Sequence, residues 1–275
     1  MLDWSHHLII PPILLPMATA ALLLFIDERS RTIKALVSLV AVVVLLANAA
    51  MLFAIESGPN AFENVYLLGN WSAPFGIVLV VDGLSAMMLL LTSILALAAL
   101  VFSLAKWHAV GAHFHSLFQL LLAGVNGALL TGDLFNLFVF FEVMLAASYG
   151  LLLHGTGTLR VKAGLHYIAI NLVAALFFLI GVSLVYGTAG TLNMADLAMR
   201  MPEMEPDRLI LMEAGAAVLG VALLIKVGMW PLCFWLPTAY SAASAPVAGM
   251  FAILSKVGIY VILRLTMLLF GEGPS

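Results

Sequence analysis

Long runs of apolar residues dominate the pattern of this 275-residue chain. A helix needs about 20 mostly apolar residues to cross a bilayer, and eight runs match that requirement. They lie at residues 8–26, 35–55, 77–105, 114–131, 134–153, 165–186, 209–230 and 245–269. The pattern therefore predicts an all-α polytopic membrane protein with about eight transmembrane helices.

The connections between these runs are short. The run at 77–105 is longer than one span needs, so its first residues, around Asp82, are expected at the membrane interface. Only Gly132 and Asp133 separate the fourth run from the fifth, which predicts a tight helical hairpin with Asp133 as the N-cap of its second helix. The longest loops hold only about twenty residues each, so no soluble domain fits between the helices.

Composition supports a membrane protein. Hydrophobic residues make up 64% of the chain and charged residues 9%, with a mean hydropathy of +1.16. Soluble domains carry about 45–50% apolar and about 25% charged residues. A net charge of −3 without a basic cluster argues against nucleic acid as a partner. The single cysteine, Cys233, excludes an internal disulfide and a thiolate zinc site.

Lysine and arginine in short loops predict the orientation, because they accumulate on the cytoplasmic side. Three of these residues fall on one side of the predicted bundle and six on the other. The larger group is Arg29, Arg31, Lys34, Lys106, Arg160 and Lys162; the smaller is Arg200, Arg208 and Arg264. The bias predicts that the larger group faces the cytoplasm, with the N-terminus outside.

Three charged residues lie well inside apolar runs: Glu142, Lys226 and Lys256. A lone charge at the bilayer centre costs about 2.5–3.5 kcal/mol, and such residues usually face the bundle interior and mark ion or proton paths. Glu142 is the ninth residue of its run. At a rise of about 1.5 Å per residue it lies about 12 Å below the surface, near the middle of a core about 30 Å thick.

A tryptophan and several prolines follow Lys226. Trp230 and Pro231 come within five residues of it, and Pro237 and Pro246 follow. Proline removes a backbone donor and clashes with the preceding turn. Broken helices are tolerated in membranes where they line a polar cavity. We therefore expect the seventh helix to break in this region.

Two interpretations of the buried charges remain open. Glu142 and Lys226 could form a structural ion pair that joins two helices. That interpretation leaves Lys256 without an acidic partner in the apolar core, so one acid and two amines suit a proton relay better. Lysine exchanges its proton readily when it is desolvated. Tyr260 follows Lys256 by four residues, so it is expected on the same helix face and within hydrogen-bonding reach.

Histidines supply the remaining candidate chemistry. His154 and His166 flank the predicted cytoplasmic loop and could deliver protons, since histidine titrates near neutral pH; a solvated interfacial role is the alternative. His108, His113 and His115 cluster after the third run, but we expect no metal there, because loop histidines are usually solvated. The chain has no GxGxxG, Walker or HExxH motif. We therefore expect no cofactor and no enzyme activity of its own.

Three stretches carry a resemblance to a known family. KVGMWPLCFWLPTAY (226–240), LSKVGIY (254–260) and FFEVM (140–144) resemble the antiporter-like subunits of respiratory complex I, membrane-bound hydrogenases and Mrp-type cation/proton antiporters. Within that family, GTLNMADL (190–197) and GDLFN (132–136) look most like the D subunit of the Mrp/Mnh/Pha antiporter. Cys233 and Tyr240 stand where many members have histidine.

The resemblance implies a Na⁺(K⁺)/H⁺ exchange system in which Glu142, Lys226 and Lys256 handle protons beside other membrane subunits. Family members have about fourteen helices, with two inverted five-helix repeats. Residues 1–110 would then hold three N-terminal helices and residues 111–270 one repeat, with the second repeat absent from a truncated or split chain. A proton-pumping subunit of an NADH:quinone oxidoreductase or hydrogenase is one alternative. A structural membrane subunit without its own transport path is another.

Overall fold

The computed structural model describes residues 4–58, 64–71, 73–155 and 157–270. The end of the sequence at Ser275, which the expectation of a truncated or split chain concerns, lies outside these residues. Within the described part of the chain, six helices are long and apolar enough to cross a membrane, and two more are shorter and apolar. This confirms the predicted helical membrane architecture. The eight helices are α1 (Pro11–Phe25), α2 (Arg31–Glu56), α3 (Gly83–Leu104), α4 (Phe114–Leu130), α5 (Leu134–Leu153), α6 (Thr158–Ala189), α8 (Pro206–Val227) and α10 (Ala245–Phe270).

Shorter elements connect the long helices. Two of them form an antiparallel β-hairpin in which Val65 pairs with Val80. The apolar pattern predicts residues 77–81 as the start of the third helix. Residues 78–81 instead form a strand, because the tetrad VLVV is rich in β-branched side chains that suit a pleated surface. The short elements are η1 (Trp4–Ile9), β1 (Asn64–Leu67), η2 (Leu68–Asn70), β2 (Val78–Val81), η3 (Trp107–Ala109), α7 (Met194–Arg200), η4 (Met201–Glu203) and α9 (Leu236–Ala242).

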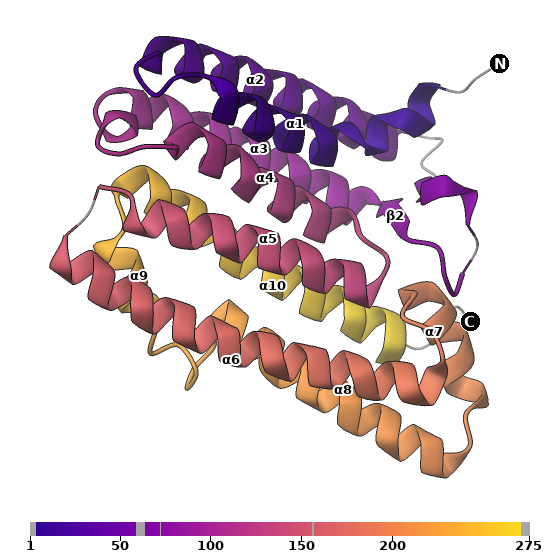
Figure 1. The fold of residues 1–275 in the computed structure, drawn as a ribbon. Coiled ribbons are helices and arrows are strands. Elements are labelled where there is room, and N and C mark those ends of the chain that lie inside the picture. Colours follow the sequence, from indigo (N-terminus) through magenta and orange to yellow (C-terminus); the bar gives the residue numbers. More distant parts are fainter. Residues whose placement is uncertain (1–3, 59–63, 72, 156, 271–275) are drawn as a thin grey trace.

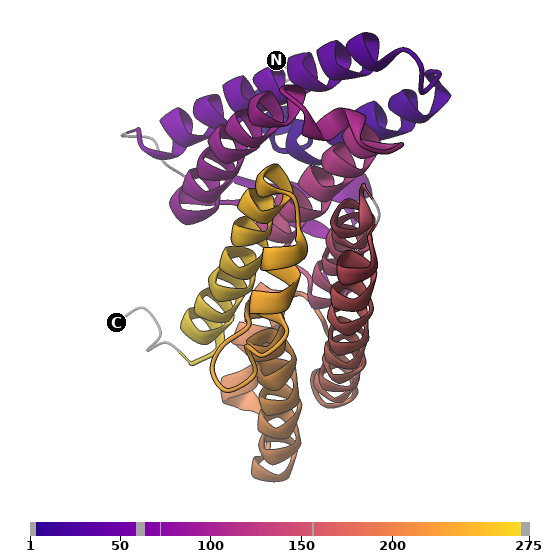
Figure 2. The ribbon, with the colours of Figure 1, turned by 90° about the vertical axis from the view of Figure 1, so that its left-hand side faces the viewer.

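The helices run side by side, and their connections gather at two ends (Figure 1). The α1–α2, α3–α4 and α5–α6 loops lie at the end that faces the viewer in Figure 2, together with α9. We call this the basic end, because it carries the six lysines and arginines of the larger group identified from the sequence. The β-hairpin and α7 lie at the opposite end (Figure 1).

The turn between α4 and α5 is held from both sides. The backbone N–H of Gly132 donates to the Val78 carbonyl at 2.8 Å, and the Gly132 carbonyl accepts from Met194 at 2.8 Å. The Asp133 side chain accepts from the Asn136 N–H at 2.8 Å, as an N-cap does. These contacts fix the start of α5 and therefore the position of Glu142 along it.

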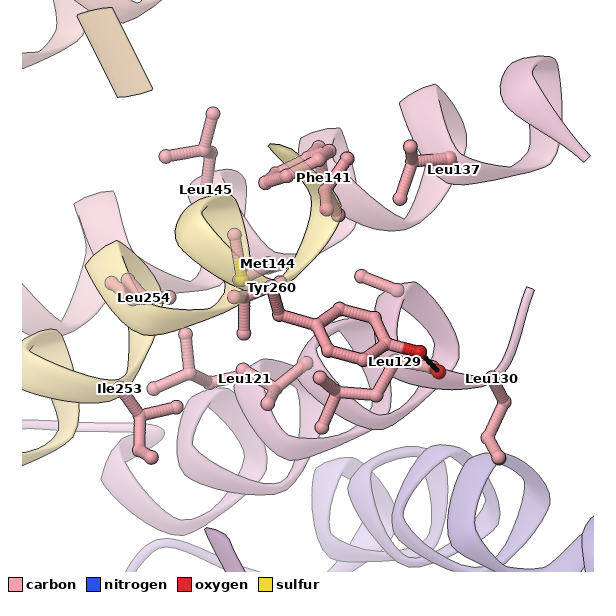
Figure 3. Close-up of a cluster of buried hydrophobic side chains, with 14 of the residues drawn as sticks. Leu121, Leu129, Leu130, Leu137, Phe141, Met144, Leu145, Ile253, Leu254 and Tyr260 are labelled. Carbon is pink, nitrogen blue, oxygen red and sulfur yellow. Dashed lines mark hydrogen bonds between the residues drawn. The ribbon is translucent and has the colours of Figure 1, made fainter. Parts of the chain in front are cut away.

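Close helix packing positions the other side of the site. A Cβ at Gly181 of α6 would lie 2.8 Å from the backbone nitrogen of Leu219 in α8, so only glycine permits this approach. Between α4, α5 and α10 lies the cluster drawn in Figure 3, where Leu121, Phe141 and Leu254 pack together. The first contact sets α8 against α6, and the cluster sets α10 against the α4–α5 hairpin.

Candidate functional site

Glu142 of α5 and Lys226 of α8 meet in the structure. Lys226 Nζ donates to Glu142 Oε1 at 3.4 Å. The Lys226 side chain is 3% exposed and that of Glu142 32%. The ammonium also lies 5.2 Å from the centroid of the Phe141 ring, which favours a cation over its face. The contact is long for a charge-assisted hydrogen bond, whose usual length is about 2.7–2.9 Å.

The end of α8 explains why a lysine is tolerated at this depth. The helix ends at Val227, and Gly228 follows in the left-handed conformation with φ of 71°. Lys226 therefore lies in the last turn, where the helix dipole favours a cation. Trp235 Nε1 donates to the Ile225 carbonyl at 3.0 Å, so that a carbonyl at the helix end keeps a partner.

A small cavity adjoins Lys226. Its volume is about 10 Å³, close to the lower limit for one water molecule. Besides Lys226, the residues of its lining that carry polar side-chain atoms are Tyr167, Asn171, Trp235 and Tyr240. Asn171 Oδ1 is buried and has no hydrogen-bond partner among the described residues. The Lys226 ammonium thus shares its cavity with an unused acceptor.

Two further hydroxyl groups lie beside this cavity. Tyr167, whose ring stacks on Trp235, exchanges a hydrogen bond of 2.9 Å with Ser148 Oγ. The hydroxyl of Tyr149 is buried without a partner in the described part of the chain. Burial of a polar group without a partner costs free energy, so these atoms mark the vicinity of Lys226 as incompletely satisfied.

Lys256 does not join this cavity. Its side chain is exposed on α10, on the face that also presents Ile259 and Leu263. No hydrogen bond or ion pair links Lys256 to another residue that the structure describes. The structure brings two of the three predicted residues together and leaves the third on an outer face.

The expectation that Tyr260 hydrogen-bonds Lys256 is wrong. Tyr260 is buried, and its hydroxyl donates to the Leu129 carbonyl at 2.8 Å (Figure 3). The same hydroxyl contacts the guanidinium of Arg264. Arg264 Nη2 in turn lies 3.0 Å from Asp82 Oδ2. Tyr260 therefore belongs to a separate network that joins α10 to α3 and α4.

His154 and His166 lie away from the cavity, at the basic end. His154 is buried, and its Nε2 lies 3.2 Å from the Trp107 carbonyl. Burial lowers its pKa below the usual range, and this hydrogen bond offsets the effect only in part. His166 is exposed and makes an edge contact with the Phe234 ring. Neither residue lines the Lys226 cavity.

The prolines divide into two groups. Trp230 and Pro231 lie in the irregular stretch between α8 and α9, which confirms the predicted break. Pro237 instead lies in the first turn of α9, and Pro246 is the second residue of α10. Proline suits a helix start because the first turn leaves its N–H groups unpaired. These two prolines therefore begin helices.

The histidine cluster shows no metal-binding arrangement. His108 Nδ1 and His115 Nε2 lie 3.2 Å apart, and His113 Nδ1 lies 2.9 Å from Glu28 Oε1. Among the described residues, no three His, Cys, Asp or Glu side chains are grouped so that they could hold a metal ion.

Asn171 and Tyr167 are candidate residues that reasoning from the sequence missed. Both interrupt the apolar run at 165–186, and the argument that singled out Glu142 applies to any buried polar residue. Amides and phenols cost less to bury than charges, so their signal in the sequence is weaker. Helix spacing alone also could not tell that α6 turns them toward α8.

Comparisons with known proteins identify relatives of this chain. A family described as "NADH:quinone oxidoreductase/Mrp antiporter, TM" matches residues 131–274. The chain is similar to a probable K(+)/H(+) antiporter D subunit of Rhizobium meliloti, with 64% identity over 99% of this chain and 51% of the relative. It is also similar to a Na(+)/H(+) antiporter D subunit of Alkalihalophilus pseudofirmus, with 40% identity over 98% of this chain and 54% of the relative.

The fold is similar to a chain in the solved structure of the Mrp complex from Dietzia sp. The TM-score is 0.90 at 34% identity, and the match covers 98% of this chain and 50% of that one. The chain thus spans about half the length of the curated relatives it matches. On the family match and this agreement of fold, the chain belongs to the family of membrane subunits shared by NADH:quinone oxidoreductases and Mrp antiporters.

Proposed function

We propose that this chain is a proton-translocating membrane subunit of a multi-subunit Na⁺(K⁺)/H⁺ antiporter, and that Glu142 and Lys226 exchange the proton. One observation carries the proposal: Lys226 is buried at a helix break, in a long hydrogen bond with Glu142. The relatives named as D subunits of cation/proton antiporters support the choice of complex.

The contact suits a pair that separates and re-forms. Glu142 is partly exposed, so its carboxylate can leave Lys226 without crossing packed side chains. Asn171 lines the same cavity as Lys226, and its Oδ1 has no partner among the described residues, so it can offer Lys226 another acceptor. A lysine amine that changes partners in a desolvated site also changes its tendency to hold a proton. Movement of the Glu142 carboxylate toward and away from Lys226 therefore makes the lysine amine take up and release a proton.

Lys256 is proposed as the outlet of this relay. Its exposed position on α10 directs it away from the Lys226 cavity and toward whatever packs on that face. In the same proposal, residues 111–270 form one five-helix repeat, the basic end faces the cytoplasm of a bacterial cell, and His154 and His166 collect protons there. Other membrane subunits are the partners, and protons and monovalent cations are the transported ions.

The test is cation-driven proton exchange in inverted membrane vesicles that contain the chain with its partner subunits. Glu142→Gln, Lys226→Ala and Lys256→Ala are each expected to abolish exchange while the complex still assembles. Glu213→Gln is the matched control, because Glu213 is an exposed acid of α8, the helix that carries Lys226. Retained exchange with reduced assembly would instead favour a structural ion pair.

The family also includes subunits of NADH:quinone oxidoreductases, in which electron transfer would drive the same relay. Exchange measured without NADH or another electron donor separates the two. If vesicles exchange protons for Na⁺ or K⁺ only when an electron donor is added, the antiporter assignment is wrong. If they do so under an imposed cation gradient alone, it stands.

A further inference from the structure

A groove at the basic end shares only His166 with the proposed relay. It lies between the first turns of α6 and the short helix α9, and its volume is about 660 Å³. Cavities of about 300–1,000 Å³ suit small ligands. The side chains that define it are Leu159, Lys162, Leu165, His166, Thr238 and Ser241.

Arg160 holds the two walls of the groove together. Its Nε donates to the Ala242 carbonyl at the end of α9, at 3.0 Å. Its Nη1 donates to the His154 carbonyl at 2.6 Å. These contacts tie α9 and the end of α5 to the start of α6, so the groove is a fixed feature of the fold. The Arg160 guanidinium is itself engaged in these hydrogen bonds.

The charge of the groove is uncompensated. Lys162 is exposed and forms no ion pair with any residue that the structure describes. Its neighbours in the lining are His166 and the hydroxyls of Thr238 and Ser241, and no acidic residue belongs to the described lining. The two hydroxyls already donate to the backbone carbonyls of Trp235 and Thr238. The Lys162 ammonium and the His166 ring supply the remaining donors, which favours an anion as the ligand.

The cleft at the opposite end provides a comparison. It has the same volume, about 660 Å³, but its lining includes both Asp82 and Arg264. These two side chains pair with each other at 3.0 Å, so their charges compensate within the protein. Of these two clefts, the one at the basic end is therefore the one that calls for an anionic partner.

The walls of the groove are apolar, which distinguishes an amphiphile from a soluble anion. Leu159 is 82% exposed and Leu165 64% exposed. Large apolar side chains that flank a cation on an open surface are unfavourable in water. Leu165, which lies deeper along α6 than Lys162, suits an acyl chain below a charged headgroup.

The length of α6 places the groove at the membrane boundary. The helix has 32 residues and is therefore about 48 Å long, against a hydrocarbon core of about 30 Å. A centred helix extends about 9 Å beyond the core at each end. Lys162, the fifth residue, then lies at headgroup level, and Leu165 and His166 lie at the start of the acyl region.

We infer that this groove binds an anionic phospholipid, with the phosphate against Lys162 and His166 and an acyl chain along Leu165. Basic pockets between transmembrane helices at the membrane surface are suited to anionic headgroups. The site is separate from Glu142 and Lys226, so it stands whether or not the relay does.

The inference can be tested by native mass spectrometry of the full chain in micelles with equimolar phosphatidylglycerol and phosphatidylcholine. A basic residue near an anionic surface contributes about 1 kcal/mol, which corresponds to about five-fold in binding. We expect phosphatidylglycerol to be retained at least about five-fold over phosphatidylcholine, and Lys162→Gln to remove most of this preference. Lys106→Gln, an exposed lysine at the same end, should leave it unchanged.

Two further measurements distinguish a bound phospholipid from a bound soluble anion. Leu165→Asn should weaken retention of phosphatidylglycerol, because it removes an apolar wall while leaving the charges. Excess inorganic phosphate should not displace the lipid; complete displacement would show a site for soluble anions and overturn the inference. Equal retention of the two lipids by the unmodified chain, or an unchanged preference in Lys162→Gln, would also overturn it. Thermal unfolding of each variant checks that it is folded.

Discussion

Two acid–base pairs join helices in this molecule, and they differ in how completely their atoms are satisfied. Asp82 and Arg264 meet at the end opposite the basic end, at 3.0 Å. Glu142 and Lys226 meet inside the bundle, at 3.4 Å. Both pairs contact an aromatic ring beside the cation, Tyr260 in the first and Phe141 in the second.

The outer pair is embedded in a capping network. Asp82 Oδ1 accepts from the Ser85 N–H at 2.7 Å, and Ser85 Oγ accepts from the Asp82 N–H at 2.8 Å. This is a capping box at the start of α3. Arg264 also contacts Tyr260, which donates to the Leu129 carbonyl. Each charged group thus has several partners that hold it in one position.

The inner pair is held by one hydrogen bond among the described residues, and polar atoms near it lack hydrogen-bond partners. Lys226 donates to Glu142 alone among the described residues, while Asn171 Oδ1 and the Tyr149 hydroxyl nearby lack partners. A satisfied pair stabilises one arrangement, whereas a pair with spare acceptors can exchange partners at low cost. The comparison therefore supports the proposal that the outer pair is structural and the inner pair handles protons.

The largest effect is expected when both members of the inner pair are neutralised. Glu142→Gln with Lys226→Met should lower cation-driven proton exchange by at least about 100-fold, the scale of a lost acid–base group. Stability should change by less than about 1 kcal/mol, because replacing a buried ion pair by groups of similar size is often neutral. Exchange in vesicles and unfolding in detergent measure the two quantities. A large loss of stability would assign the inner pair a structural role.

The outer pair should give the reverse result. Asp82→Ala removes an N-cap worth about 1 kcal/mol and a partly exposed ion pair worth up to about 1 kcal/mol. We expect about 1 to 2 kcal/mol of lost stability in denaturant unfolding, and exchange per assembled complex close to that of the unmodified protein. If Asp82→Ala abolishes exchange in fully assembled complexes, the division between the pairs fails.

A smaller effect is expected at Asn171. A hydrogen bond to a charged group is worth about 1.5–3 kcal/mol, so Asn171→Leu should slow exchange by about ten-fold or more. Asn126→Leu is the matched control. Asn126 is also buried with an unpaired Oδ1, but it donates to the Pro12 carbonyl and does not line the Lys226 cavity. Equal effects of the two variants on exchange would remove Asn171 from the mechanism.

The smallest effect concerns pH. Burial lowers the pKa of His154 below its usual value of about 6.5, so the unfolded chain binds this proton more readily than the folded one. Stability from this group is therefore present above pH of about 6.5 and is lost as pH falls from there toward the folded pKa. His154→Gln should reduce the decline of Tm in acid by about 2 °C, measured between pH 5 and 8. An unchanged decline would show that other groups cause it.

The sequence predicted the helices well because each is a long apolar run. The predicted run at 134–153 coincides with α5, since Asp133 and the basic-end loop bound it on both sides. The β-hairpin was missed because its second strand is four apolar residues that adjoin a much longer apolar run. At that length, strand and helix cannot be separated by periodicity.

The site was predictable in part. The cost of a charge inside lipid singled out Glu142 and Lys226, and their contact was one of two interpretations left open. Lys256 and Tyr260 show the limit of that reasoning. A spacing of four leaves the two side chains about 40° apart around the helix axis, and here this rotation separates an exposed face from a buried one. The Tyr260 hydroxyl donates to the Leu129 carbonyl instead, and the sequence does not show that these two groups lie together.

The exposed amine at mid-length of α10 also bears on how the chain enters the bilayer during synthesis. Lys256 opposes lateral exit from the translocation channel by about 2.5–3.5 kcal/mol, and flanking residues such as Ile259 and Leu263 each return only about 0.3–0.6 kcal/mol. The free-energy cost of inserting α10 is lower when another protein subunit, rather than lipid acyl chains, covers the face that carries Lys256. Insertion and subunit association are thus expected to proceed as one coupled event at α10.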